Sequence, residues 1–148
     1  ILVVDDTPEL KVAIKYACKR AWKTGGRVSL LHVIEPADFQ HWAAVAETMR
    51  TERREEAERV LHDLAAHVND LAGAMPILYV REGNPRDVIE QIIREEPRIA
   101  VLVLGASSEK KGPGPLVSQL AGKLSGKFPI PITVVPGTLT DEQIDALT

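Results

Sequence analysis

Acidic and hydroxyl side chains follow the first apolar run of this 148-residue chain. Asp5, Asp6 and Thr7 come directly after residues 1–4, and a segment rich in Gly, Ser, Lys and Pro follows the apolar run at residues 99–104. A carboxylate at such a place can accept a hydrogen bond from a ligand's amine or hydroxyl, or it can cap the helix that follows. The residues alone leave both roles open for the acidic pair.

The segment at residues 105–115 has a composition typical of anion-binding loops. It combines small residues with Lys110 and Lys111, and a helical pattern starts directly after it. Backbone amides in such a loop, together with the start of a helix, can hold a phosphate group. Its glycines and prolines are equally typical of a long surface loop. A phosphate site and a purely structural connection therefore both remain open here.

Side chains that could support metal binding or covalent catalysis are sparse. His62 and His67 are five apart on an expected helix, which places them on different faces, and no cysteine or carboxylate spacing completes a metal site. His32 and His41 stand alone. No serine belongs to a nucleophile motif with a partnered His and Asp. We therefore expect the histidines to be solvated or packed.

Short apolar runs typical of buried strands alternate with amphipathic helical patterns along the chain. The expected strands are residues 1–4, 28–34, 76–80, 99–104 and 132–135. The expected helices lie between Thr7 and Gly25, at about residues 37–71, after Gly83-Asn84-Pro85, and at residues 116–124. Phe39 and Trp42, near the start of the long helix, are expected to pack on the core or on a partner subunit rather than to form a recognition stripe.

Three helix starts carry cap signals. Thr7, followed by a proline, predicts an N-cap with proline at the first helical position. Asn84, also followed by a proline, predicts the same arrangement for the third long helix. Thr140 and Gln143 form a capping-box pair that predicts a short terminal helix.

Every expected strand is joined to the next through a helix, so the strands must run parallel with right-handed crossovers. We therefore predict an α/β fold: a doubly wound three-layer sandwich with a five-stranded parallel sheet, four main helices and a short C-terminal helical tail. In such a sheet, ligands bind beyond the carboxyl ends of the strands, where the strand order reverses. The candidate site is thus the edge that carries Asp5–Thr7, Val33–Glu35 and Gly105–Ser108.

Composition and charge are those of a globular protein with no electrostatic preference for polyanions. The chain is 45% hydrophobic and 26% charged, and its net charge is -3. Nucleic acid and anionic membranes are therefore not expected partners. No apolar run approaches the roughly 20 residues of a membrane span, and we expect no leader before the first strand. The lone cysteine, Cys18, cannot form an internal disulfide, which fits a reducing cytoplasm.

Residues 1–136 resemble the universal stress protein family. The matching segments are Ile1-Leu2-Val3-Val4-Asp5-Asp6-Thr7-Pro8-Glu9, Ala13-Ile14-Lys15-Tyr16-Ala17, Leu30-Leu31-His32-Val33, Gly83-Asn84-Pro85, residues 101–105 and Pro131-Ile132-Thr133-Val134-Val135. The resemblance implies a family domain at residues 1–136 and a C-terminal extension at residues 137–148. It also implies a stress-response module that binds ATP or another adenine nucleotide, with Mg2+ arriving only with the nucleotide.

The phosphate-binding motif of the family's ATP-binding members is only partly present. That motif has a Gly, two residues, a Gly, nine residues, and then a Gly with Ser or Thr. Gly105 matches the first glycine, whereas Ser108, Ser118 and Gln119 stand at the other three positions. A side chain at 108 or 118 would crowd the close approach of a phosphate to the backbone. Two glycines inside the nine-residue interval offer a different anion loop, near the two lysines.

By resemblance, Asp5 and Val33 lie beside ribose and adenine, and the last strand pairs across a two-fold axis to form a homodimer. The nucleotide-binding residues that we predict are Asp5, Asp6, Thr7, Val33, Leu104, Gly105, Ser107, Ser108, Gly112, Gly114, Ser118 and Gln119. The predicted interface residues are Ile132, Thr133, Val134 and Val135. The alternative is a dimeric regulatory protein of the same fold that contacts a protein partner and binds no nucleotide. A slow ATPase has less support, because no general base, nucleophile or metal-ligand set is identifiable.

Overall fold

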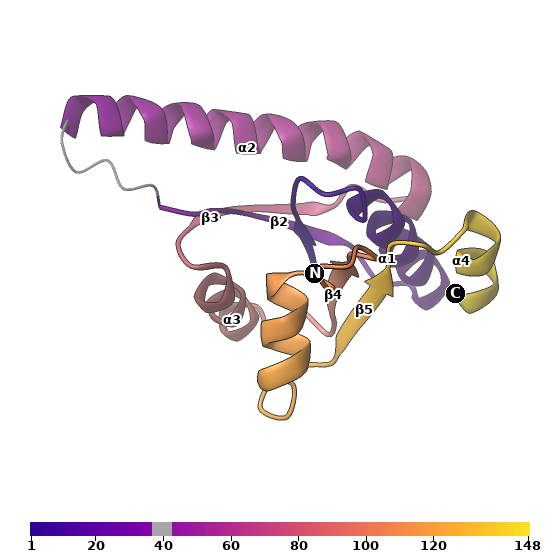
Figure 1. The fold of residues 1–148 in the computed structure, drawn as a ribbon. Coiled ribbons are helices and arrows are strands. Elements are labelled where there is room, and N and C mark those ends of the chain that lie inside the picture. The colour runs from indigo at the N-terminus through magenta and orange to yellow at the C-terminus, as the bar shows by residue number, and fades with distance from the viewer. Residues whose placement is uncertain (37–42) are drawn as a thin grey trace.

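Five parallel strands form one sheet in the computed structural model, which describes residues 1–36 and 43–148. The strands are β1 (Leu2–Val4), β2 (Ser29–Ile34), β3 (Ile77–Glu82), β4 (Leu102–Ala106) and β5 (Ile132–Pro136). The helices of the described part are α1 (Leu10–Thr24), α2 (Ala43–Ala72), α3 (Pro85–Glu95), η1 (Val117–Lys123) and α4 (Asp141–Leu147). Figure 1 shows their arrangement.

The strand order is β3-β2-β1-β4-β5, and each neighbouring pair is parallel. The chain builds outward from β1 through β2 to β3, and then returns to the other side of β1 for β4 and β5. Strand order therefore reverses between β1 and β4, which is the switch point of a doubly wound sheet. The predicted α/β sandwich, with four main helices and a helical tail, is confirmed.

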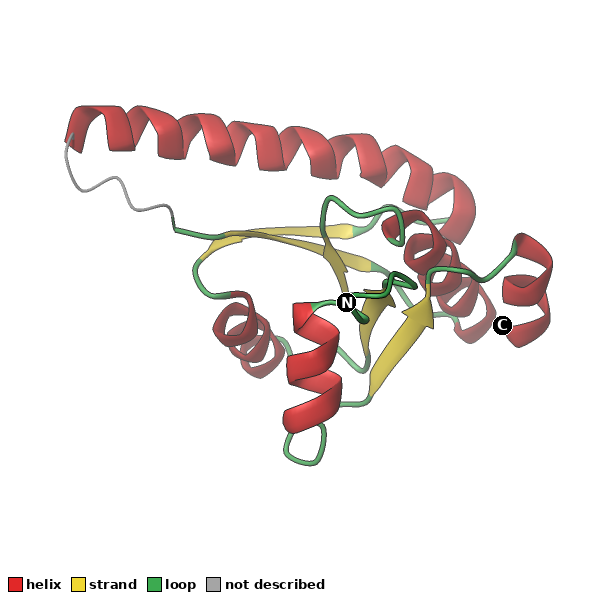
Figure 2. Cartoon of the chain, in the orientation of Figure 1, coloured by secondary structure: helices red, strands yellow, loops and turns green. Residues whose placement is uncertain are grey.

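Helices cover both faces of the sheet, as Figure 2 shows. Because successive side chains of a strand point to opposite faces, Val4 packs with α1 and α2 while Val3 packs with α3 and η1. Leu30 and Leu31 divide between the same two cores, and both are fully buried. Burial of each such leucine contributes about 1.5–3 kcal/mol, so the continuous apolar runs seen in the sequence are required on both faces.

Two of the predicted helix caps are confirmed. The Asn84 side chain accepts hydrogen bonds from the backbone N–H groups of Arg86 at 3.1 Å and Asp87 at 3.4 Å, and Pro85 starts α3. Thr140 Oγ1 accepts from the Gln143 N–H at 3.2 Å, and the Gln143 side chain accepts from the Thr140 N–H at 2.9 Å. Both signals were local in sequence, and both helices begin where these signals place them.

The predicted cap of α1 is wrong. This helix begins at Leu10, its cap position is Glu9, and no side chain caps it. The Thr7 hydroxyl instead donates to Asp5 Oδ1 at 2.6 Å, and the Leu10 N–H donates to the Thr7 carbonyl at 3.3 Å. A carboxylate two residues away captures the hydroxyl, so a turn, with Pro8 inside it, precedes the helix.

The predicted limits of the fourth strand also need correction. The apolar run at 99–104 was expected to end at Gly105, whereas β4 begins at Leu102 and includes Gly105. The strand pairs along its whole length with β5, from Leu102 opposite Ile132 to Ala106 opposite Pro136. The Ile99 N–H is used in a turn, where it donates to the Glu96 carbonyl. Pairing with the neighbouring strand, rather than hydrophobicity, sets these limits.

Two helices differ from the expected pattern. Residues 37–42, which were expected to begin the long helix and which include Phe39, His41 and Trp42, lie outside the described residues. From Ala43 onward α2 follows the prediction, and in Figure 1 its start projects past the sheet. The expected helix at 116–124 is core-packed through Val117 and Leu120, but it is a π-helix with a wider turn. None of the helices in the described ranges is long and apolar enough to cross a membrane.

The C-terminal tail packs on α1. Lys15 Nζ lies 2.8 Å from Asp141 Oδ1, Lys19 Nζ lies 2.5 Å from Asp145 Oδ1, and Ile144 is fully buried. The hydrogen bond from Lys19 lowers the pKa of Asp145. Such exposed ion pairs contribute little to stability, so the buried isoleucine is the main anchor of α4.

Gly137 lies where the tail leaves the sheet. Its N–H donates to the Ala106 carbonyl at 2.9 Å, and a Cβ at this position would collide with Glu9 Cγ. Gly105 is in a similar position, because an ideal Cβ there would lie 3.2 Å from Glu9 Cβ and 3.3 Å from the Glu9 carbonyl oxygen. The Glu9 side chain is thus packed against two glycines.

Buried titratable groups are few in the described part of the chain. Cys18 is fully buried on α1, and burial raises the pKa of its thiol to about 11, which makes it a poor nucleophile. His32 is half-buried on β2 with no hydrogen-bond partner for Nδ1, and desolvation lowers its pKa. His62 and His67 are exposed on α2, as expected of solvated histidines.

We expect His32 to make the fold sensitive to mild acid. Above its ordinary pKa of 6.5 the imidazole is neutral in both the folded and the unfolded state. As the pH falls below that value, the unfolded chain takes up a proton that the folded chain resists, so the free energy of unfolding falls until the lowered folded pKa is passed. Urea unfolding at about pH 7.5 and about pH 5.5 would measure this loss. A His32→Gln variant should lose less stability over the same interval, and an equal loss would contradict the assignment.

Gly137→Ala should destabilise the protein by about 1–3 kcal/mol, because the added methyl overpacks the contact with Glu9 and would lie 3.1 Å from the Ala106 oxygen. Gly126→Ala is the matched control, since a Cβ there has no atom within 4 Å. Urea denaturation of both variants measures the difference. Equal stabilities would show that the close approach is absent.

Candidate functional site

The candidate site opens between the carboxyl ends of β1 and β4. These two strands are paired in register only at Leu2 and Val103, and β1 ends at Val4 while β4 continues to Ala106. The space beyond their ends is a cavity of about 440 Å³, a volume within the usual range for small-molecule pockets. It lies at the switch point of the sheet, where the fold favours a ligand.

Several separate segments form the wall of this cavity, which we call the crevice. The lining residues are Val3, Asp5, Thr7, Glu9, Glu35, Asn84, Pro85, Arg86, Leu104, Gly105, Ser107, Pro113, Gly114, Pro115, Leu116, Val117 and Gln119. Apolar side chains from the sheet and from η1 form its deep part, and polar residues from strand ends and helix starts surround them.

The structure brings together seven of the twelve predicted nucleotide-binding residues. Those that line the crevice are Asp5, Thr7, Leu104, Gly105, Ser107, Gly114 and Gln119. Those that do not are Asp6, Val33, Ser108, Gly112 and Ser118. Val33 is half-buried in β2 opposite Arg81 and packs into the core with α3, while Glu35, two residues later, reaches the crevice.

Asp5 and Asp6 have different positions although they are adjacent in sequence. Asp5 lines the crevice and accepts the Thr7 hydroxyl through Oδ1. Asp6 is exposed and does not line the crevice. This pair therefore offers one carboxylate to a ligand.

The loop after β4 is closed by its own hydrogen bonds. The Ser107 N–H donates to the Pro113 carbonyl at 3.2 Å, and Ser107 Oγ accepts from the Glu109 N–H at 3.1 Å. Gly112 and Gly114 have φ of 102° and 106°, which a residue with a side chain adopts only with strain. The two glycines are thus needed to shape this loop, and Gly114 also lines the crevice.

The residues that the starts of α1 and α3 contribute to the crevice were not predicted from the sequence. Glu9 lines the crevice because the start of α1 lies on Gly105. Asn84 and Arg86 line it because α3 packs on the core face next to β1 and β4, although it follows the distant strand β3. One signal was available, since Asn84 follows a strand whose carboxyl end must reach the same edge of a parallel sheet.

The crevice is lined by more negative than positive side chains. Asp5, Glu9 and Glu35 contribute carboxylates, and among the described lining residues Arg86 contributes the only cationic side chain. Arg86 Nε also lies 3.4 Å from Glu90 Oε1 on the same helix. In the described ranges no three His, Cys, Asp or Glu side chains gather closely enough to hold a metal ion. The arrangement suits a ligand that offers hydrogen-bond donors more than it suits a polyanion.

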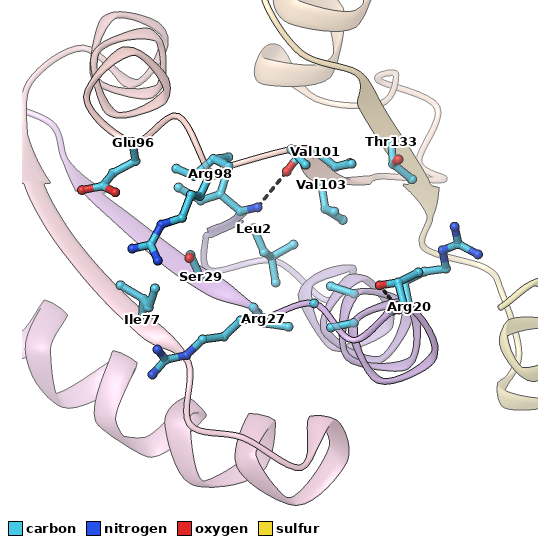
Figure 3. A pocket seen from close by; sticks show the side chains of 18 of the residues that line it. Leu2, Arg20, Arg27, Ser29, Ile77, Glu96, Arg98, Val101, Val103 and Thr133 are labelled. Atoms are coloured by element: carbon cyan, nitrogen blue, oxygen red, sulfur yellow. Dashed lines mark hydrogen bonds between the residues drawn. The ribbon is translucent and has the colours of Figure 1, made fainter.

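A larger cavity, of about 510 Å³, lies at the amino ends of the strands, and Figure 3 shows it. Arg20, Arg27 and Arg98 surround it, and Leu2 and Val103 form its apolar wall. Arg27 Nε is already used, since it donates to the Met75 carbonyl at 2.9 Å. We assign the ligand site to the crevice instead, because the carboxyl ends of parallel strands converge there with loops and helix starts.

Comparisons with known proteins agree with this geometry. No curated protein sequence matches the chain. Solved structures do: universal stress protein UspA from Lactobacillus plantarum is 18% identical, with a TM-score of 0.72 over 90% of this chain and 95% of that chain. A protein of the universal stress protein family from Burkholderia pseudomallei is 20% identical, with a TM-score of 0.68 over 91% and 93%. A universal stress protein solved in complex with cAMP is 16% identical, with a TM-score of 0.53 over 90% and 94%.

At such identities the solved structures show only that the fold is shared. Membership of a family is shown instead by the amino-acid sequence. The model of the universal stress protein family matches residues 1–136, which include every strand of the sheet and every residue that lines the crevice. The resemblance noted from the sequence is thereby confirmed, and this chain belongs to the universal stress protein family.

Proposed function

We propose that the protein is a stress-response module that binds an adenine nucleotide in the crevice. The observation that carries this proposal is the crevice itself, about 440 Å³ at the switch point, where Asp5, Gly105 and Gly114 meet from three separate segments. Adenine and ribose offer N–H and O–H donors to the carboxylates and an apolar face to Leu104. The structurally similar protein solved with cAMP supports the same ligand class.

ATP remains one member of that class, and any Mg2+ would enter with the nucleotide. The alternative is a regulatory protein that contacts a protein partner in the cytoplasm without nucleotide. The loop after β4 favours this second function, because Ser107 and Glu109 are held by hydrogen bonds within the loop itself. Direct binding measurements separate the two.

A ligand that binds only the folded state must stabilise it, by about 2.7 kcal/mol at a hundredfold excess over Kd. We therefore expect at least one of adenosine, AMP, cyclic AMP, ADP and ATP to raise the melting temperature and to give a binding isotherm in calorimetry. Asp5→Ala should abolish both signals, because it removes the carboxylate that lines the crevice. Asp6→Ala is the matched control and should bind like the parent chain, since Asp6 lies outside the crevice. If no nucleotide at millimolar concentration raises the melting temperature, the nucleotide-binding function is contradicted and the regulatory function without nucleotide is favoured.

We also propose that two copies of the chain pair through β5. This strand is at one end of the sheet order, and its residues Ile132, Thr133 and Val134 are only half-buried. An edge strand offers unpaired backbone groups to a second strand. Pairing across a two-fold axis would cover the exposed β5 edge of each copy at once.

Val134→Asp should convert a dimer to a monomer, because it places a charge in the apolar interface. The matched control is Val80→Asp, at a half-buried position of β3 on the opposite edge of the sheet. Light scattering coupled to size exclusion gives the mass, and circular dichroism checks that both variants fold. A folded Val134→Asp protein with an unchanged dimeric mass would reject this interface.

A further inference from the structure

The cavity at the amino ends of the strands, drawn in Figure 3, has no part in the function proposed above. Its wall is mainly apolar and comes from the first residues of several strands and from α1. Val101 is exposed in this wall, and Ile77 and Ile99 are half-buried. A ligand that covers such open apolar surface gains free energy in proportion to the area removed from water. The cavity, of about 510 Å³, is large enough for a small molecule.

Three arginines surround this apolar wall. Arg20 belongs to α1, Arg27 precedes β2, and Arg98 precedes β4. In the part of the chain that the structure describes, none of the three forms an ion pair with a carboxylate. Glu96 is the one acidic side chain among the described lining residues. The side chains around the cavity therefore carry a net positive charge, although the net charge of the chain is -3.

The close view in Figure 3 shows a cationic end and an apolar floor. The guanidinium groups of Arg98 and Arg27 reach the same side of the cavity, where Ile77 also lies. Leu2 and Val103 lie beside them, towards the centre of the view. One ligand can therefore meet charge at one end and apolar surface along the rest of its length.

A carboxylate is the head group that these arginines suit. A guanidinium binds a carboxylate through two parallel N–H···O bonds, which adds geometric specificity to the attraction of opposite charges. Arg27 Nε donates to the Met75 carbonyl at 2.9 Å, which helps to hold the side chain in place. Its terminal N–H groups have no acceptor within the described ranges, so they remain available to a ligand.

We propose that this cavity is a second ligand site, which binds a carboxylate that carries an unbranched acyl chain, as in a fatty acid of medium length. Arg27 and Arg98 bind the head group, and the chain lies on the apolar wall. The site is independent of the nucleotide-binding function, because the two cavities lie at opposite ends of the strands and share none of the described residues.

The test is calorimetric titration with hexanoate, octanoate and decanoate, below the concentrations at which these acids aggregate. Affinity should rise about three- to fourfold for each added CH₂ group until the apolar wall is covered. Octanol has the chain of octanoate without its charge, and it should bind about tenfold more weakly or worse.

Arg98→Gln should weaken the binding of octanoate by about fivefold or more and leave that of octanol unchanged, because it removes only the charge beside the head group. Arg94→Gln is the matched control and should bind both compounds like the parent chain. It removes the same charge from an exposed position of α3 that does not line the cavity.

Each part of the proposal has a result that would overturn it. Octanol that binds as tightly as octanoate would remove the role of the arginines, and equal affinities of hexanoate and octanoate would remove that of the apolar wall. These comparisons use the parent chain, so they hold even where Arg98→Gln is unstable. Asp5→Ala should bind octanoate normally, and a loss would place the acid in the crevice instead. No binding of any of the three acids would overturn the site itself.

Discussion

The close approach of α1 to β4 at Gly105 is the contact on which the rest of the structure depends. An ideal Cβ on Gly105 would be in tight contact with Glu9, and a Cβ on Gly137 would collide with the Glu9 side chain from the other side. Through these contacts the start of α1, the end of β4 and the start of the C-terminal tail hold one another. The tail is then anchored further along α1 by Ile144. The same contact brings an acidic side chain to the crevice, so packing and ligand chemistry are set together.

This contact gives a structural reason for Gly105, the one glycine that the chain shares with the family's phosphate motif. Gly105 belongs to β4 and is needed for packing against α1, whether or not a phosphate approaches it. The positive-φ glycines at 112 and 114 shape a loop whose hydrogen bonds are largely internal. Retained spacing in a motif therefore shows that a connection of the same length is present, and its hydrogen bonds decide what that connection can hold.

The likeness to solved universal stress proteins illustrates that a fold can be kept while the residues of its ligand site change. Identities of 18% and 20% accompany TM-scores of 0.72 and 0.68, because buried positions need only apolar residues of suitable size. Ligand chemistry depends on particular side chains at the ends of strands and helices, and these are free to change without disturbing the core. The shared fold thus accounts for a crevice at the switch point, and this chain's own residues set the chemistry of its wall.

The sequence by itself determined the elements and their order, because periodicity and cap signals such as Asn84 with Pro85 act over a few neighbouring residues. It also placed Asp5 and Ser107 at the edge where the crevice lies, because the carboxyl ends of parallel strands all lie at the same edge of a sheet. Only the tertiary structure decided that β4 begins at Leu102, because strand limits depend on pairing with β5. It alone brought Glu9 and Arg86 to the crevice, since their positions depend on how α1 and α3 pack against strands distant in sequence.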